Sequence, residues 1–477
     1  MRSQTLDIGI LHFIGIGGIG MSGIAEVMHN LGYNIQGSDA VANNNVQRLR
    51  GLGIKIIIGH HERNIGKAGV VVVSSAVPKD NVEAIAARAN SIPLVSRSEM
   101  LAELMRLKTC IAVGGTHGKT TTTSMIAAVL DAFKMDPTVI NGGIINAYGT
   151  NARLGHSDWM VVEADESDGS FLRLPSAMAV VTNIDPEHLD YYGTFEALKR
   201  GFRQFVANIP FYGVAFLCSD NDEVSTLIGE ISDRKLLTYG IEDGARVKAE
   251  NLAITPVGTY FDVHLKDEVF ETKKVLREVY LSMPGVHNVR NALAAIALGC
   301  ELDIPEELIR KALANFSGVK RRFTFVGEVS GIKIFDDYGH HPVEIAAVLQ
   351  TARQISVGRV IAVVQPHRYS RLKALFDSFC LCFDDADVVI VADVHPAGEK
   401  PIDGINRDSL VAGIADRGHE NVYPLISPRV LPEVIIEHCE KGDAVIFLGA
   451  GTITGWANGL PQQLQELGLL SLPGKIG

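Results

Sequence analysis

The stretch AVGGTHGKTTTTSM at residues 112–125 constrains the fold most, because its glycine-rich loop joins an apolar run to a helical pattern. The run at 108–114 predicts a buried strand, and 121–133 predicts a helix. A strand, a glycine loop and a helix in succession are typical of a parallel α/β sheet, where loop N–H groups and the start of the helix bind phosphate. The loop is one residue shorter than the usual GxxxxGK[ST] pattern, so Gly114 or Gly115 takes the place of the first glycine.

A structural turn that contains GKT by chance is the alternative interpretation of this loop. Four threonines at Thr120–Thr123 would be unusual at the start of a purely structural helix, since β-branched residues are only modest helix formers. The motif therefore favours a nucleotide-binding site, in which Lys119 reaches the β- and γ-phosphates and Thr120 offers a hydroxyl to Mg²⁺.

The same alternation of strands and helices continues along the chain, and 477 residues are enough for about three domains. We predict an α/β fold with a Rossmann-like domain at 1–105, a P-loop ATPase-like domain at 106–320 and a second Rossmann-like domain at 321–477. Residues 245–280 predict antiparallel strands, which we expect to form a side layer, and 287–302 predict a helix. Other expected strands end in acidic residues or glycine, and these are 33–39, 159–165, 178–185, 332–337, 387–393 and 443–451.

Composition excludes several classes of protein. The net charge of −11 argues against a nucleic-acid partner, which requires a basic surface. Six cysteines form no CxxC pair, so a reducing compartment is expected. Residues 8–25 are apolar, but their six glycines and the charged segment that follows argue against a membrane span or signal peptide. We therefore expect a cytoplasmic protein with no membrane partner.

A second glycine motif, GIGGIG at residues 15–20, follows an expected strand and precedes an expected helix. Asp39 lies about twenty residues further on, as in the fingerprint of dinucleotide-binding proteins. The glycine turn lets any diphosphate approach the start of a helix, so the motif suits UDP as well as NAD. An NAD-linked oxidoreductase is thus one alternative, although it leaves the phosphate loop unexplained.

Acidic side chains follow two strands of the central block. Glu163, Asp165, Glu166 and Asp168 come after one strand, and carboxylate oxygens of this kind can hold Mg²⁺. A solvated acidic loop is an equally good interpretation for Glu166 and Asp168. His188 lies three residues after the acid that ends the next strand, and its value as a ligand depends on a nearby triphosphate site.

In the third block, acids, aromatic residues and histidines cluster at the end of one strand, and a histidine with two arginines follows the next. Two arginines can clamp a carboxylate through paired N–H donors, whereas a salt-bridge network at a helix start is the alternative. A metal site here is disfavoured, because no third ligand has a typical spacing. The residues are Asp336, Asp337, Tyr338, His340 and His341, then His367, Arg368 and Arg371.

Taken together, HFIGIGGIGMSGIAE, GTHGKTTTT, EADESDGSF, NIDPEHLDYYG, HNVRNA, DDYGHHPVE and QPHRYSR resemble the Mur ligase family of ATP-dependent amide-bond-forming enzymes of peptidoglycan synthesis. The resemblance spans all three blocks. It implies a UDP-binding first domain, an ATP-binding central domain and a third domain that closes over the substrates. It also implies ATP and Mg²⁺, with two ions, as cofactors.

The resemblance further implies a role for individual residues. Catalysis would depend on Lys119, Glu163 and His188, and the metal ligands would be Thr120, Glu163 and His188. The ATP site would comprise Gly115, Thr116, His117, Gly118, Lys119, Thr120, Thr121, His287, Asn288, Asn291, Arg322 and Asp337. The other substrates would meet Gly17, Gly18, Gly20, Asp39, His60, Ser74, Ser75, Tyr338, His341, His367, Arg368 and Arg371. Sibling ligases carry a carbamoylated lysine beyond the metal-binding histidine, whereas this chain has Arg203 at the corresponding count and Lys199 too early. Either the second metal is held differently here or the alignment slips at this position.

The motifs are most similar to those of the family member that adds the first amino acid. The implied reaction joins L-alanine to the lactyl carboxylate of UDP-N-acetylmuramate through an acyl phosphate, in a monomer or weak homodimer. The base that deprotonates alanine is not identified by the motifs, although His341 is one candidate. Two further alternatives are a recycling ligase that adds a tripeptide to the same UDP-sugar and a nonenzymatic P-loop switch.

Overall fold

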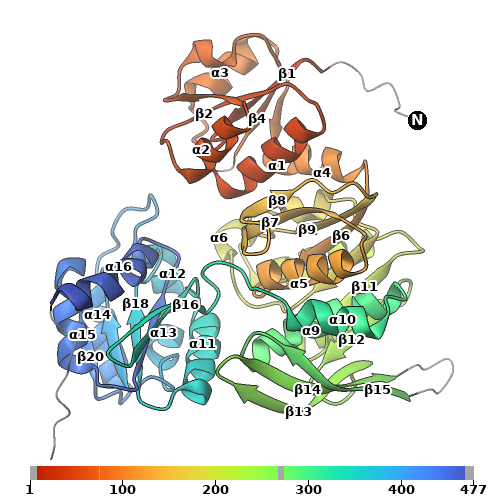
Figure 1. The fold of residues 1–477 in the computed structure, drawn as a ribbon. Helices are drawn as coiled ribbons and strands as arrows, with labels where there is room; N and C mark the ends of the chain where they lie inside the picture. Colours follow the sequence, from red (N-terminus) through yellow and green to blue (C-terminus); the bar gives the residue numbers. More distant parts are fainter. Residues whose placement is uncertain (1–7, 75, 267–272, 468–477) are drawn as a thin grey trace, which may run out of the picture. The chain divides into compact units, whose positions relative to one another are not determined.

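The computed structural model describes residues 8–74, 76–266 and 273–467. Contacts divide the chain into two compact units. The first extends to Ser317, and the second comprises the chain from Gly318 onward together with Leu252–Tyr260 and Leu281–Asn288. Three sheets account for the strands of the described residues, one in each predicted block, so the predicted three-domain α/β fold is confirmed (Figure 1).

The N-terminal sheet has five parallel strands in the order β3-β2-β1-β4-β5. Its central strands, β1 (Ile10–Ile14) and β4 (Ala68–Val73), are rich in Ile and Val, which suits strands covered by helices on both faces. As predicted, the glycine motif follows β1 and leads into α1 (Ile19–Asn30). The remaining elements are β2 (Ile35–Asp39), α2 (Asn44–Gly51), β3 (Lys55–Ile58), η1 (Glu62–Ile65), α3 (Val82–Ala89), β5 (Leu94–Ser96) and α4 (Arg97–Met105).

The central sheet has ten strands in the order β15-β14-β13-β12-β11-β10-β6-β9-β7-β8. β6 (Thr109–Gly114) lies between β9 (Trp159–Glu163) and β10 (Met178–Val181) and runs parallel to both. The carboxyl ends of these three strands therefore meet at one edge, where ligands bind in open α/β sheets. Other elements are α5 (Lys119–Ala132), β7 (Thr138–Ile145), β8 (Thr150–Arg153), η2 (Ser170–Arg173), α6 (Leu189–Tyr192), α7 (Phe195–Ala207), β11 (Val214–Cys218), α8 (Asp222–Glu230), β12 (Lys235–Gly240), α9 (Val286–Glu301) and α10 (Glu306–Ala314).

The prediction that residues 245–280 form a side layer is wrong. β13 (Val247–Thr255), β14 (Gly258–Lys266) and β15 (Lys273–Leu281) extend the central sheet instead. The end of β12 pairs with the start of β13 in parallel, so the edge of β12 finds a backbone partner there. An edge strand with unpaired N–H and C=O groups is a liability, and extending the sheet pairs β12 and makes β15 the edge strand instead.

The C-terminal sheet has six strands in the order β16-β17-β21-β18-β19-β20. β16 (Thr324–Val329) runs antiparallel to β17 (Ile332–Asp337), and the other pairs are parallel. Apolar residues of the sheet and its helices form two buried clusters, one on each face. Remaining elements are α11 (Pro342–Ile355), β18 (Val360–Val364), α12 (Tyr369–Ala374), α13 (Phe376–Leu381), β19 (Val388–Val391), α14 (Arg407–Asp416), β20 (Val422–Pro424), η3 (Pro428–Val430), α15 (Leu431–His438), β21 (Ala444–Leu448) and α16 (Ile453–Glu466).

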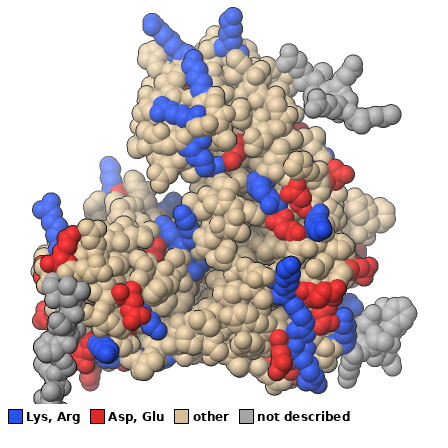
Figure 2. Space-filling model, in the orientation of Figure 1, with Lys and Arg blue, Asp and Glu red and all other residues tan. Residues whose placement is uncertain are grey.

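The surface carries charges of both signs. On the face drawn in Figure 2, basic side chains outnumber acidic ones on the N-terminal domain, whereas charges of both signs mix on the other parts. None of the helices in the described part of the chain has the length and apolar character needed to cross a membrane.

Candidate active site

The glycine loop between β6 and α5 is held by the neighbouring strand β10. The backbone N–H of Thr116 donates to the carbonyl of Asn183 at 3.0 Å, and the N–H of His117 donates to the Asn183 side chain at 2.7 Å. Gly115 has a φ of +128° and Gly118 a φ of +81°, and residues other than glycine rarely adopt these backbone angles. The loop is therefore fixed before any ligand binds, and its motif glycines are required by its backbone.

Lys119, the first residue of α5, turns back onto this loop. Its Nζ donates to the carbonyls of Gly115 and Thr116 at 2.6 and 3.0 Å, and to Glu166 at 2.9 Å. Burial alone would lower the pKa of Lys119, but the charges of Glu166, Glu163 and Asp165 raise it, so the lysine stays protonated. Burial raises the pKa of Glu166 to about 7, against the opposing effect of Lys119.

A group of potential metal ligands lies beside this lysine. Atoms of Glu166, Glu187 and His188 lie within 4.8 Å of one another, and His188 Nε2 is 3.8 Å from Glu166 Oε1. Glu166 is only 1% exposed, so the solvated-loop interpretation is wrong for this residue. Glu163 ends β9, where its carboxylate accepts a hydrogen bond from the N–H of Gly142 at 2.7 Å. Thr120 and Thr121 are buried in the first turn of α5.

The predicted adenine-side residues lie at the start of α9. The side chain of Asn288 donates to the carbonyl of Pro284 at 2.8 Å, which fixes the beginning of this helix. One turn along, Asn291 accepts a hydrogen bond from the Thr122 hydroxyl at 3.1 Å. A Cβ at Gly118 would lie 2.5 Å from the same Asn291 oxygen, so Asn291 packs closely against the glycine loop. His287 is the second residue of α9.

The N-terminal glycine turn is stabilised by Asp39 at the end of β2. One carboxylate oxygen accepts from the N–H of Gly17 at 2.8 Å, and the other accepts from the N–H of Val41 at 3.1 Å. Asp39 thus stabilises the glycine turn by accepting two backbone hydrogen bonds. Gly18, Gly20 and Ser74 line a cavity of about 290 Å³ together with Glu163 and Asp165. Ser75 lies outside the described residues.

His60 belongs to a buried polar network in the same domain. At its centre is Glu83, which is fully buried and bonds to His12 Nε2 at 2.9 Å and to Asn64 at 2.6 Å. The Ser38 hydroxyl donates to it at 2.5 Å, and His60 Nδ1 lies 3.4 Å from its second oxygen. The network ties the segment after β3 to β1 and α3.

In the C-terminal domain, Asp337 is the last residue of β17 and Tyr338 follows it. Asp337 accepts from the N–H groups of Phe323 and Gly339 at 2.7 and 2.6 Å, and burial raises its pKa to about 6. The guanidinium of Arg322 lies 5.3 Å from the centre of the Tyr338 ring. His341 is buried and caps α11, where its Nδ1 accepts from the N–H of Val343 at 3.4 Å. This capping role gives His341 a structural function.

The predicted carboxylate clamp lies after β18. His367 stacks on His395 with ring centres 5.3 Å apart, and Arg371 Nη1 lies 3.4 Å from His367 Nδ1. Burial and neighbouring positive groups lower the pKa of His367 to about 3, so it is neutral at pH 7. Arg368 is the N-cap residue directly before α12, has a φ of +70° and is exposed. The structure therefore brings His367 and Arg371 together and adds His395, which the sequence analysis did not single out.

Family models match the three sheets in turn. The model described as Mur ligase family, catalytic domain, matches residues 10–109, the Mur ligase middle domain matches 113–299, and the Mur ligase, glutamate ligase domain, matches 321–451. The chain belongs to the Mur ligase family. The predicted membership is confirmed.

Similar Mur ligases include proteins named UDP-N-acetylmuramate–L-alanine ligase. The one from Parvibaculum lavamentivorans is 60% identical over 98% of this chain and 95% of its own length. The one from Acidiphilium cryptum is 61% identical over 98% of both chains. Among solved structures, UDP-N-acetylmuramate-alanine ligase from Thermotoga maritima is 29% identical, covers 96% of this chain and 99% of its own, and has a TM-score of 0.80.

The two residues considered for the position of the carbamoylated lysine both lie on α7 and form ion pairs. Arg203 is exposed and pairs with Glu230 at 3.3 Å, whereas Lys199 pairs with Glu223 at 3.1 Å. The metal-ligand group described above contains neither residue. Glu166 supplies the buried carboxylate in that group.

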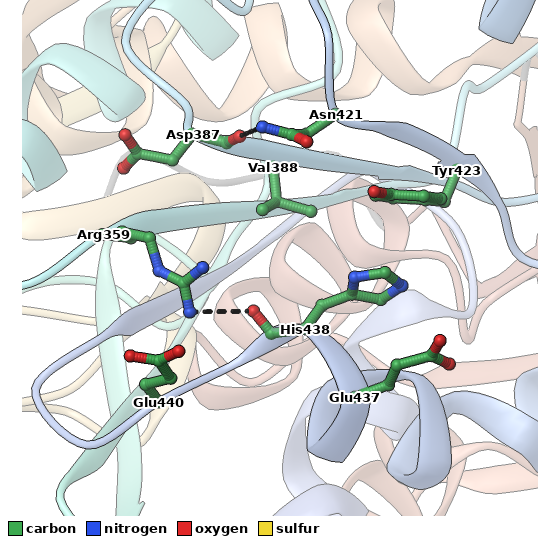
Figure 3. Close-up of a pocket in the computed structure, with 8 residues that line it drawn as sticks. All are labelled: Arg359, Asp387, Val388, Asn421, Tyr423, Glu437, His438 and Glu440. Atoms are coloured by element: carbon green, nitrogen blue, oxygen red, sulfur yellow. Dashed lines mark hydrogen bonds between the residues drawn. The ribbon is translucent and has the colours of Figure 1, made fainter. Parts of the chain in front are cut away.

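A second polar cavity of this Mur ligase lies at the opposite edge of the C-terminal sheet (Figure 3). It has a volume of about 350 Å³, and three of its residues, Arg359, Asp387 and Asn421, immediately precede β18, β19 and β20. Arg359 is neutralised by Asp443 at 2.8 Å and donates to the carbonyl of His438 at 3.0 Å. This cavity is therefore separate from the carboxyl-end residues that form the candidate site.

Proposed function

We propose that this Mur ligase uses ATP to join L-alanine to the lactyl carboxylate of UDP-N-acetylmuramate, giving ADP and phosphate in peptidoglycan precursor synthesis. The observation that carries the proposal is one cavity lined by both the N-terminal glycine turn and Glu163, whose charge acts on the phosphate-loop lysine. A UDP-sugar at the turn would direct its far end toward the site of phosphoryl transfer. The names and 58–61% identity of the curated relatives support the choice of substrates.

The chemistry needs no nucleophile from the protein. The lactyl carboxylate attacks the γ-phosphorus of ATP, and ADP leaves with the electrons of the broken P–O bond. The amine of L-alanine then attacks the carbonyl of the acyl phosphate and expels phosphate, while a base removes the extra ammonium proton. Lys119 contributes charge stabilisation, and the fixed loop contributes positioning.

We propose the following division of the chain. Residues 1–105 bind the UDP-sugar, 106–320 bind ATP through Gly115–Thr121, and 321–477 supply Tyr338, His367, Arg368 and Arg371 for muramate and alanine. Two Mg²⁺ ions bound by Thr120, Glu163 and His188 would neutralise phosphate charge, with Glu166 and Glu187 as further oxygen donors in place of the carbamoylated lysine. This assignment rests on the family and on the charges at the site. The proposed cytoplasmic location rests on the family.

Competition between two acceptors tests this function. The purified protein receives ATP, Mg²⁺, UDP-N-acetylmuramate and equal amounts of L-alanine and L-Ala-γ-D-Glu-meso-diaminopimelate, and the products are identified by mass. We expect the alanine adduct to dominate, with phosphate release only when the UDP-sugar and an acceptor are both present. A dominant tripeptide adduct would assign the protein to murein-peptide recycling instead.

A further inference from the structure

The cavity beside the N-terminal glycine turn contains one basic side chain among the described residues that line it. That side chain is Arg97, and the acidic ones are Glu163 and Asp165. The cavity of about 290 Å³ extends from Gly18 and Gly20 to these acids. A ligand with several negative charges would be repelled by the two carboxylates. It therefore needs a cation on its own side of the cavity, and Arg97 is placed to supply it.

Local structure fixes the position of Arg97. It is the first residue of α4, directly after β5, and a capping box between Ser96 and Glu99 defines the start of that helix. Its Nη1 would lie 3.0 Å from a Cβ at Gly20, so the absence of a side chain at Gly20 makes room for the guanidinium. The cation thus lies against the first turn of α1.

Arg97 is weakly engaged by its neighbours. Its Nη2 lies 3.4 Å from an oxygen of Asp165, and the arginine side chain is 18% exposed. A guanidinium has five N–H donors, and among the described residues this long contact uses one of them. The first turn of α1 has no acidic residue and no side-chain cap, so it offers N–H groups to an anion beside Arg97.

We propose that Arg97 is a substrate-binding residue that exchanges Asp165 for the diphosphate of the UDP-sugar. This inference rests on the proposed function and adds a residue to its first substrate site. A paired arrangement supports it: Asp165 holds Arg97 at the glycine turn, and the next residue, Glu166, holds Lys119 at the phosphate loop. Each cation that would meet a substrate phosphate is thus held by one of two adjacent acids.

Binding of uridine, UMP and UDP by calorimetry tests the proposal on the full-length protein without ATP. Arg97→Met keeps the apolar stem and removes the charge, and Arg97→Lys keeps the charge and removes the paired donors. We expect Arg97→Met to weaken UDP binding about 10- to 100-fold and to leave uridine binding within about twofold. The UDP affinity of Arg97→Lys should lie between that of the unaltered protein and that of Arg97→Met. Arg106→Met is the matched control, because Arg106 follows the same helix but is exposed and pairs with Glu103.

Each possible result supports or overturns the proposed role of Arg97. Unchanged UDP affinity in Arg97→Met overturns the proposal, and a selective loss of UDP-N-acetylmuramate affinity with normal UDP affinity assigns Arg97 to the sugar carboxylate instead. Equal weakening of uridine and UDP, or a lowered melting temperature in Arg97→Lys, indicates a structural role. If the unaltered protein binds neither UDP nor the UDP-sugar, the proposed function itself is wrong.

Discussion

At the scale of single residues, Lys119 of the phosphate loop is held by contacts within the protein. Its ammonium group is buried against Glu166 and two loop carbonyls, so its charge is compensated. A buried charge without a partner would be costly, which explains why an acid occupies this position. In the proposed function, ATP would displace Glu166 from Lys119, and the freed carboxylate would remain next to the potential metal ligands Glu187 and His188.

Glu83 is a second residue whose charge is defined by its surroundings. Burial alone would raise its pKa, but hydrogen bonds from His12, Ser38 and Asn64 outweigh burial and lower the pKa from 4.5 to about 2. The folded state therefore prefers the ionised carboxylate. This preference stabilises the fold above the unfolded pKa of 4.5 and is lost as the pH falls toward 2.

We expect Glu83→Gln to destabilise the protein by about 3–5 kcal/mol at pH 7, because it removes the charged acceptor of several buried hydrogen bonds. The difference in unfolding free energy from the unaltered protein should shrink as the pH is lowered from 4.5 toward 2. Denaturant unfolding at several pH values measures both effects. Glu62→Gln, on the surface of the adjoining segment, is the control. A difference that stays constant with pH would contradict the assigned charge.

At the scale of elements, the strand–loop–helix units follow directly from the sequence. Apolar runs such as 108–114 and helical patterns such as 121–133 gave β6 and α5 within a few residues, because both are local properties. The position of 245–280 was not predictable in this way, since it depends on which sheet edge lacks a partner. Burial of Glu166 likewise depends on Lys119, which is 47 residues away in the chain.

Sheet-edge reasoning placed Glu163 and His188 near the phosphate loop, but it missed Asn183, which holds that loop. Asn183 follows β10, the strand next to β6, so the same reasoning applied to amides would have found it. His395 was missed because its partner His367 comes from another strand end. Local pattern thus locates an edge, whereas pairings across that edge require the fold.

Gly115→Ala tests the element scale. At a φ of +128° the new side chain is strained, and its Cβ would lie 2.0 Å from the Thr182 hydroxyl and 2.9 Å from the Thr182 nitrogen. Strain alone costs about 1–3 kcal/mol, and the loop must also move away from β10. We expect ATP affinity to fall at least about tenfold with normal UDP affinity. Gly32→Ala is the control, because its φ is +94° but no atom lies within 4 Å of the new Cβ. Equal loss in both variants would indicate a global defect.

At the scale of the whole molecule, the proposed function assigns one reactant to the carboxyl-end residues of each of the three sheets. The chain needs separate sites because a nucleoside triphosphate, a UDP-sugar and an amino acid have different charges and sizes. The N-terminal turn and the phosphate loop belong to one compact unit. Glu163 and Asp165 line the cavity beside the turn, and their charges also act on Lys119 of the phosphate loop. Tyr338, His367 and Arg371 belong to the other unit. This division suits a reaction in which the first two reactants combine before the third attacks.

The order of these two steps predicts the fate of a carboxylate oxygen. Amide formation removes one of the two lactyl oxygens, and its destination depends on how the carboxylate is activated. If the carboxylate attacks the γ-phosphorus, that oxygen bridges carbon and phosphorus and leaves with phosphate when the amine attacks. With oxygen-18 in both lactyl positions, we expect one label in phosphate and one in the amide, measured by mass spectrometry. Omitting L-alanine, as a control, should prevent release of labelled phosphate. Label in AMP would indicate an adenylate, and label in water would indicate condensation without phosphorylation, and either result would exclude the acyl-phosphate route through Lys119.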